Sequence, residues 1–269
     1  MTLWAVDSHV HFHKCFDEGL FFDSCFDNLS RITSSSIING ILFFTEGKNE
    51  DSFNYLKSKT KIESSSNKDV IYVVSQIDNG NAIDVRWIDA GIRIIIFPGF
   101  QIVTKENLEV LSLGTNKRLS DGASIEETIA NVISIGGIPV LPWGFGKWYG
   151  NRGKKVEELI RKKISPLFFG DNGGRSSLLP FPVQFKTAQM NDIKIFPGSD
   201  PLPFSDGQMR AMSYGFTIDA EINESNPWGS IKETLLNADL KIEKFGRLTQ
   251  PWSFVKTQVA MQIKKRKNK

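Results

Sequence analysis

The chain has 269 residues, of which 40% are hydrophobic and 23% charged, and its formal net charge is +3. These proportions are those of an ordinary globular protein, and the charge is too weak to favour nucleic acid as a partner. No apolar run reaches the roughly 18 residues of a membrane-spanning helix, and the N-terminus lacks the basic and apolar regions of a signal peptide. We therefore expect a cytoplasmic protein with no membrane partner, whose cysteines, Cys15 and Cys25, are free thiols.

Short apolar runs rich in β-branched and aromatic residues are predicted as strands. In chain order these are Leu3–His9, Ile37–Phe44, Val70–Ser75, Ile92–Phe97, Glu109–Leu113, Ile138–Leu141, Pro166–Phe169 and Lys194–Phe196. Helix signals fall between and after them. The helices expected are one opened by a capping box at Ser124, then Lys154–Lys163, Pro182–Met190, Gln208–Tyr214, one opened by a capping box at Ser230, and Val255–Lys264. The serine triplets at 34–36 and 64–66 are typical of loops or helix ends.

Strands that alternate with helices indicate a parallel sheet covered by helices. At this length the pattern predicts an α/β fold of the TIM-like (β/α)7–8 barrel type, in regular or distorted form. We expect a single barrel domain over residues 1–254, since no linker divides it. Residues 255–269 are expected to form the end of a C-terminal helix and a basic tail, which is either solvated or in contact with an anionic partner.

The three histidines of the chain lie in one segment near the N-terminus. Because side chains alternate along a strand, Asp7, His9, His11 and His13 are expected on one face. Two imidazoles two residues apart on a strand face can bind one metal ion. The alternative is a strand that carries histidines by chance, but chance rarely places the only three histidines of a chain at period two.

Polar and glycine-rich residues follow several predicted strands, at the strand ends where function sits in parallel α/β folds. With the histidines exhausted, further metal ligands must be carboxylates or amides, and Glu46, Asp171 and Asp200 are the best placed. Such a mixed set suits one divalent ion, zinc, manganese or iron, which makes a nucleophile of a bound water. Each carboxylate has an alternative: a salt bridge for Glu46, and a turn or cap for Asp171 and Asp200.

Two further segments are candidates for binding an anion. Gly170–Arg175 is rich in glycine, so its amides can approach a phosphate that Arg175 clamps, although glycine-rich turns are common. Lys147 lies between Trp143 and Trp148 and can hold a negatively charged or ring-bearing ligand. The alternative there is a rim of packed aromatic side chains.

These motifs, which cover most of the chain in order, resemble the PHP superfamily of metal-dependent phosphoesterases, the polymerase and histidinol phosphatase type, within the wider amidohydrolase-like barrels. Asp7–His11 matches the first motif, in which both histidines bind metal. Phe44–Gly47 lies where the family has Thr-Asp-His, and Pro98–Thr104 resembles the segment with a metal-bridging glutamate. Leu108–Gly114 followed by Gly137–Pro142 resembles the stretch that ends in His-Pro, and Pro197–Asp200 resembles the closing Gly-Ser-Asp-x-His.

The chain departs from the family at four ligand positions. These hold Gly47 in place of a histidine, Gln101 in place of the glutamate, Pro142 or Trp143 in place of a histidine, and Leu202 in place of the closing histidine. The usual three-metal site is therefore incomplete. The resemblance implies one ion held by His9, His11 and Asp200, with Glu46 as a fourth ligand or as the base.

The leading hypothesis is a metal-dependent hydrolase of the PHP type that acts on a phosphate ester or another small anionic substrate. Glu46, Asp200 and Asp171 are its candidate catalytic residues, and Asp171 is the alternative general base. The candidate substrate-binding residues are Gln101, Lys147, Asn172 and Arg175. A second hypothesis is a non-catalytic barrel that binds an anionic metabolite or a partner protein. A third, a deaminase or amide-cleaving amidohydrolase, is disfavoured because no histidine remains for the later strands.

Overall fold

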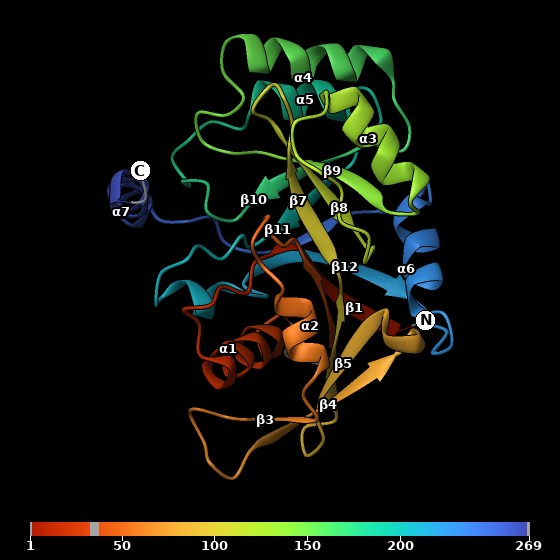
Figure 1. Cartoon of the computed structure of the whole chain (residues 1–269), viewed down its shortest axis with the longest axis vertical. Coiled ribbons are helices and arrows are strands. Elements are labelled where there is room, and N and C mark those ends of the chain that lie inside the picture. The colour runs from red at the N-terminus through yellow and green to blue at the C-terminus, as the bar shows by residue number, and fades with distance from the viewer. Residues whose placement is uncertain (1, 33–37, 268–269) are drawn as a thin grey trace.

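The computed structural model describes residues 2–32 and 38–267 of the chain. The first residue of the strand expected at Ile37–Phe44 and the serine triplet at 34–36 lie outside this part. Two β-sheets form the centre of the molecule, and helices cover them (Figure 1). No helix in the described ranges is long and apolar enough to cross a membrane.

The larger sheet has eight strands in the order β13-β12-β1-β2-β6-β5-β4-β3. Their bounds are β1 Thr2–Val10, β2 Asn39–Phe44, β3 Lys61–Glu63, β4 Ile71–Ile77, β5 Ala82–Trp87, β6 Ile92–Phe97, β12 Tyr214–Ala220 and β13 Glu243–Gly246. Parallel pairing is confined to β1 with β2 and β2 with β6. The remaining pairs are antiparallel.

The smaller sheet has five strands in the order β11-β10-β9-β8-β7. Their bounds are β7 Gly99–Val103, β8 Glu109–Leu113, β9 Ile138–Pro142, β10 Phe168–Asn172 and β11 Ile195–Gly198. The strands β9, β10 and β11 run parallel, whereas β7 and β8 form an antiparallel hairpin that continues antiparallel into β9. Every strand predicted from the sequence is present, and β3, β5, β7, β12 and β13 are additional.

The expectation of a regular parallel barrel is wrong, because no ladder joins the two sheets in the described part of the chain. They meet at two seams. At one seam Glu46 bridges to Phe100, and at the other the Asp200 amide donates to the His9 carbonyl at 2.8 Å. The physical reason is chain length: residues 104–108 are too few for a parallel crossover, so β7 and β8 can pair only as a hairpin.

The helices surround this centre. Their bounds are α1 Glu18–Ser30, α2 Ser52–Lys57, α3 Ile125–Ser134, α4 Asn151–Lys162, α5 Val183–Gln189, α6 Pro227–Leu236 and α7 Pro251–Lys267, with 3₁₀ turns η1 Asp78–Gly80 and η2 Gly207–Arg210. Figure 1 shows α3, α4 and α5 together over the smaller sheet, α1 and α2 beside the larger one, and α7 standing apart at one side. The domain boundary expected between residues 254 and 255 falls inside α7, which runs from Pro251 to Lys267. This boundary remains a prediction.

Two helix predictions need correction. Ser230 does not open a helix: it lies inside α6, which is capped instead by the Asn226 side chain accepting from the Gly229 amide at 3.0 Å. The segment Gln208–Tyr214 forms the end of η2 and the start of β12. The capping box at Ser124 is confirmed, since its side chain accepts from the Glu127 amide at 3.3 Å.

The strand β1 is fixed from both faces, and this positions the histidines. Ala5 and Val10 pack into one hydrophobic cluster together with the phenylalanines of α1. Trp4 and Val6 pack into a second cluster between the two sheets. A strand held on both faces has little freedom to slip in register, because a shift of one residue would expose every buried side chain.

Candidate metal centre and its pocket

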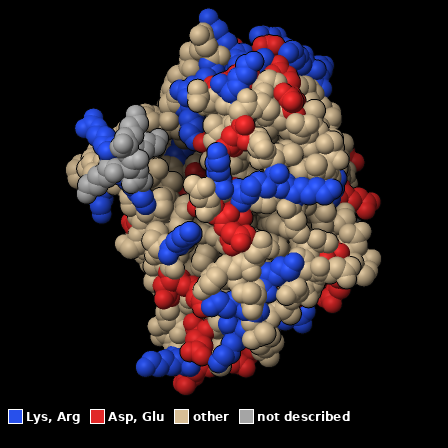
Figure 2. All heavy atoms as spheres, in the orientation of Figure 1, with Lys and Arg blue, Asp and Glu red and all other residues tan. Residues whose placement is uncertain are grey.

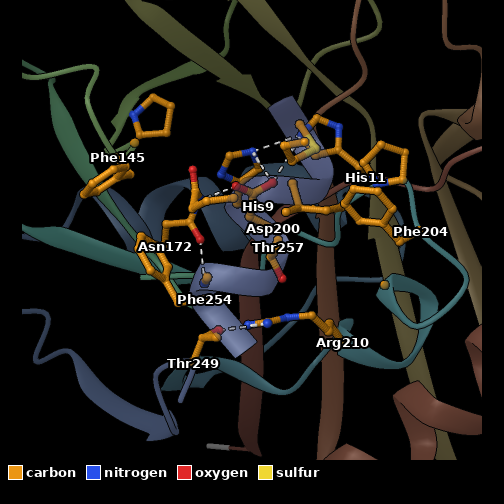
Figure 3. Close-up of a pocket in the computed structure, with 18 of the residues that line it drawn as sticks. His9, His11, Phe145, Asn172, Asp200, Phe204, Arg210, Thr249, Phe254 and Thr257 are labelled. Atoms are coloured by element: carbon orange, nitrogen blue, oxygen red, sulfur yellow. Dashed lines mark hydrogen bonds and ion pairs between the residues drawn. The ribbon is translucent and has the colours of Figure 1, made fainter. Parts of the chain in front are cut away.

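A pocket of about 980 Å³ opens where β1 and β11 end. It is lined by the three histidines, by residues of several strand ends and by one side of α7. Figure 2 shows the surface hollowed between α7 and the body of the molecule, and Figure 3 shows the lining side chains. The size is that of a site for a small molecule.

His9, His11 and Asp200 bring three potential ligand atoms together in this pocket. Nε2 of His9 lies 3.2 Å from Nε2 of His11, and each lies 3.7 Å from Oδ1 of Asp200. Ligand atoms at about 2.0–2.1 Å from a tetrahedral ion are themselves about 3.3–3.4 Å apart. The spacing and the nitrogen and oxygen donors therefore fit one divalent transition-metal ion, with room for further ligands from the open side of the pocket.

Local sequence explains why Asp200 reaches the histidines. Gly198 passes so close to β1 that a Cβ there would lie 2.5 Å from the His9 Cβ, so only glycine permits this approach. Asp200 itself has a φ of 48°, a left-handed conformation that aspartate tolerates better than most residues. The turn after β11 thereby directs its carboxylate toward the two imidazoles.

Burial and charge set the protonation of these groups. Burial lowers the pKa of His9 to about 4, which leaves the neutral imidazole that a metal ligand requires. Burial also disfavours the charged form of His11, but Glu50 and Asp200 outweigh it, and the net pKa of His11 is raised. For Asp200 burial raises the pKa, but His9 and His11 outweigh it, so the net pKa is lowered and the carboxylate is ionised.

A second group adjoins the first and consists of His11, His13 and Glu50. Nδ1 of His13 lies 2.7 Å from Oε1 of Glu50, while its Nε2 lies 3.0 Å from the Pro201 carbonyl oxygen. Both ring nitrogens of His13 thus face acceptors within the protein, so His13 could bind a metal ion only by giving up one of these contacts. Glu50 also accepts from the Gly47 amide at 2.7 Å and lies 3.5 Å from Nδ1 of His11.

Glu50 was not predicted from the sequence, since it lies in a loop with no periodicity to mark it. Burial raises the pKa of Glu50, but His11 and His13 outweigh this and hold it well below its usual range. A carboxylate beside the outer nitrogen of a ligating histidine is the usual way in which proteins orient that ring. Glu50 lies on that side of His11 at ion-pair distance, while Nδ1 of His11 makes no hydrogen bond with the described residues.

Glu46 lies outside both groups. Its Oε1 accepts from the Phe53 amide at 2.6 Å, and its Oε2 lies 3.3 Å from Nη2 of Arg118. Burial raises the pKa of Glu46. This carboxylate is therefore engaged within the protein at the seam between the sheets, whereas Gln101, on the neighbouring strand, lines the pocket.

Lys147 and Asn172 also line the pocket. The ammonium group of Lys147 forms an ion pair with the Glu109 carboxylate, a partner that the sequence did not indicate. The amide of Asn172 donates to Oδ2 of Asp200 and so holds the carboxylate from the side away from the histidines (Figure 3).

Asp171 and Arg175 bond to each other inside the protein. Nε of Arg175 donates to Oδ1 of Asp171 at 3.0 Å, and both side chains are almost fully buried. Tyr214 donates its hydroxyl to Oδ2 at 2.7 Å, and Nζ of Lys244 lies 3.1 Å from the same atom. This quartet ties β10 to β12 and β13, and neither Asp171 nor Arg175 is among the residues that line the pocket.

Replacing Arg175 by methionine is expected to lower the free energy of unfolding by about 3 kcal/mol, because it leaves the buried Asp171 carboxylate with only part of its compensation. Urea denaturation measures the change. Arg161→Met, on the basic last turn of α4, is the matched control and should stay within about 0.5 kcal/mol of the wild type. A loss below about 1 kcal/mol in Arg175→Met would contradict the structural role.

The same quartet predicts an acid dependence of stability. Burial raises the pKa of Asp171, but Arg175, Lys244 and Tyr214 outweigh it, and the net pKa is lowered. A lowered pKa means that the stabilisation is complete above the unfolded value of about 3.9 and is lost as the pH falls further. Unfolding followed from about pH 5 down to about pH 2 should show this loss in the wild type and a smaller one in Arg175→Met.

Comparison with known proteins identifies similar structures. No protein-family model and no curated protein sequence matches the chain. PsfC from Pseudomonas syringae PB-5123 is similar with a TM-score of 0.56 at 13% identity, over 97% of this chain and 99% of PsfC. The lesion-specific endonuclease PfuEndoQ from Pyrococcus furiosus is similar with a TM-score of 0.50 at 11% identity, over 90% of this chain and 58% of that protein. At these identities the likeness concerns the fold alone, a mixed α/β fold.

Proposed function

We propose that the protein is a hydrolase that depends on one divalent metal ion and acts on a phosphate ester or another small anionic substrate. The observation that carries the proposal is the convergence of His9, His11 and Asp200, from β1 and the turn after β11, on one point of the pocket. The fold likeness to an endonuclease and the PHP-like motifs support the same class.

His9, His11 and Asp200 would hold the ion. When bound, it supplies Lewis acidity and lowers the pKa of water beside it. Glu50 would orient His11 through the ring nitrogen that faces away from the ion. Asn172 would fix Asp200, and Gln101 would position the substrate by hydrogen bonding.

The geometry narrows the roles proposed for the other carboxylates. Asp200 is retained as a ligand. Glu46 and Asp171 are each engaged by partners within the protein, so neither is assigned as the base. Glu50 and Glu109 line the pocket but are paired as well, with His11 and His13 and with Lys147, so no carboxylate is assigned as the base. A bound ion would supply the activation of water. Lys147, paired with Glu109, would neutralise an anionic group only if a substrate replaced that partner.

A non-catalytic binding protein is the second candidate. One specific observation favours it: Gly47, Gln101 and Leu202 line the pocket at positions where the family that the sequence resembles has metal ligands.

A turnover assay distinguishes the hydrolase from the binding protein. Metal-loaded protein assayed on a panel of phosphomonoesters and phosphodiesters should release product under the hydrolase proposal. Tight metal binding together with no turnover on the panel would favour the binding protein.

A further inference from the structure

Arg210 is a cation of the pocket wall that the metal centre does not use. It ends η2 and extends along the pocket toward Thr249 (Figure 3). Its Nη1 donates to the Thr249 hydroxyl at 2.9 Å, and this hydroxyl donates in turn to the Gly173 carbonyl at 3.0 Å. Its Nε is buried and has no hydrogen-bond partner among the described residues. The guanidinium group is therefore held in place with most of its donors unused.

The charges around the pocket leave Arg210 without a counterion. Glu109 is paired with Lys147, Glu50 lies against His11 and His13, and Asp200 lies against His9 and His11. Across residues 2–32 and 38–267, no carboxylate is within ion-pair distance of Arg210. Burial lowers the pKa of Arg210, and Asp200, Asp7 and Asp206 oppose this from a greater distance.

We infer that Arg210 binds the phosphoryl group of the substrate, in the same pocket as the metal centre. The inference rests on the proposed function and names the group of the substrate that Arg210 recognises. A guanidinium group offers donors in a planar fork that matches two oxygens of a phosphoryl group, and a partly buried cation without a counterion favours an anionic ligand.

Aromatic rings elsewhere in the wall of the same pocket give the ester a second contact. Phe145 and Phe254 line the pocket with their ring centroids 5.2 Å apart, and Phe254 belongs to α7. Phe204 lies on the other side, with Nζ of Lys264 at 5.5 Å from its ring centroid. The organic part of the ester is assigned to these rings, so α7 supplies one wall of the substrate site.

Calorimetric titration of the whole chain with inorganic phosphate, with and without bound Mn²⁺, tests the inference. Arg210→Gln is expected to weaken phosphate binding by about 10- to 100-fold, the factor for a lost charge-assisted hydrogen bond, and Arg210→Lys by less. Arg31→Gln, at an exposed position where Arg31 pairs with Asp27, is the matched control and should bind phosphate as the wild type does. Unchanged phosphate affinity in folded Arg210→Gln, or acetate bound as tightly as phosphate, would overturn the inference.

A measurement on the unmutated protein tests the inference even if Arg210→Gln does not fold. Phenylglyoxal modifies arginines, and peptide mapping reports the rate at each one. Phosphate should slow modification of Arg210 and leave Arg31 unaffected, whereas equal rates at Arg210 with and without saturating phosphate would contradict the inference. The two proposals can fail separately. If the wild type binds no metal but binds phosphate through Arg210, the hydrolase proposal is contradicted and the inference stands. If the wild type binds metal but its phosphate affinity does not depend on Arg210, the inference is contradicted and the hydrolase proposal stands.

Discussion

Replacing both His9 and His11 by alanine is expected to abolish metal binding and to lower hydrolytic activity by about 1,000-fold or more. The reason is that two of the three converging ligand atoms are lost, and loss of even an indirect partner of a ligand costs about 10- to 100-fold in metal affinity or activity. Elemental analysis of the purified variant, followed by kinetics in excess Mn²⁺ or Zn²⁺, measures both effects.

His13→Ala is the matched control for this pair. His13 comes from the same segment, but both of its ring nitrogens face acceptors in the protein. We therefore expect the variant to keep its metal, with an affinity within about tenfold of the wild type. Equal loss of metal in His13→Ala and in the double variant would instead place the ion in the His11–His13–Glu50 group.

Replacing Asp7 by alanine is expected to lower the free energy of unfolding by about 4 kcal/mol and metal affinity by about 10- to 100-fold. Asp7 is fully buried, and its carboxylate accepts from the Ser199 amide at 2.9 Å, from the Ser199 hydroxyl at 2.5 Å and from the Met212 amide at 2.9 Å. Burial raises the pKa of Asp7 to about 6, so the carboxylate is ionised at neutral pH. Loss of this carboxylate would leave several buried donors without an acceptor and would free the turn that carries Asp200.

Denaturant unfolding and metal titration of the same samples check this expectation. Asp7→Asn keeps one oxygen acceptor and should fall between the wild type and Asp7→Ala. Asp219→Ala, at an exposed position on the strand that pairs with β1, is the control and should change stability by less than about 0.5 kcal/mol. An Asp7→Ala protein as stable as the control would show that the strand ends are held by other contacts.

Much of the fold could be predicted because its strands are apolar on both faces. Runs such as Ile92–Phe97 and Glu109–Leu113 have the same bounds in the structure as in the prediction. Their direction could not be read from the same signal, since burial on both faces does not distinguish a parallel strand from a central antiparallel one. The short connections around β5, β7 and β8 decide the direction. The helix α1 escaped prediction because its sequence, rich in phenylalanine, also has strand character.

The candidate site also contains residues that the sequence predicted and residues that it did not. The spacing of two residues correctly predicted that His9 and His11 meet, although His11 lies just past the end of β1 and the ladder with β2 shifts register between Asp7 and Val10. Asp200 could be predicted because it follows a strand end. Glu50 and Arg210 could not, since each reaches the pocket from a loop or a 3₁₀ turn whose position depends on the whole fold. Asp171 and Arg175 satisfy each other's charge across four residues, and sequence spacing alone cannot separate such a pair from a ligand-binding pair.

The most direct test of the central claim is the metal stoichiometry of the unmutated protein. Purified protein is stripped with a chelator, dialysed against Mn²⁺ or Zn²⁺ and analysed for bound metal beside the His9→Ala/His11→Ala variant. The claim predicts one ion per chain in the wild type, none in the variant, and a higher unfolding temperature for the loaded wild type alone. A wild type that retains no more metal than the variant, with no change in unfolding temperature, would contradict it.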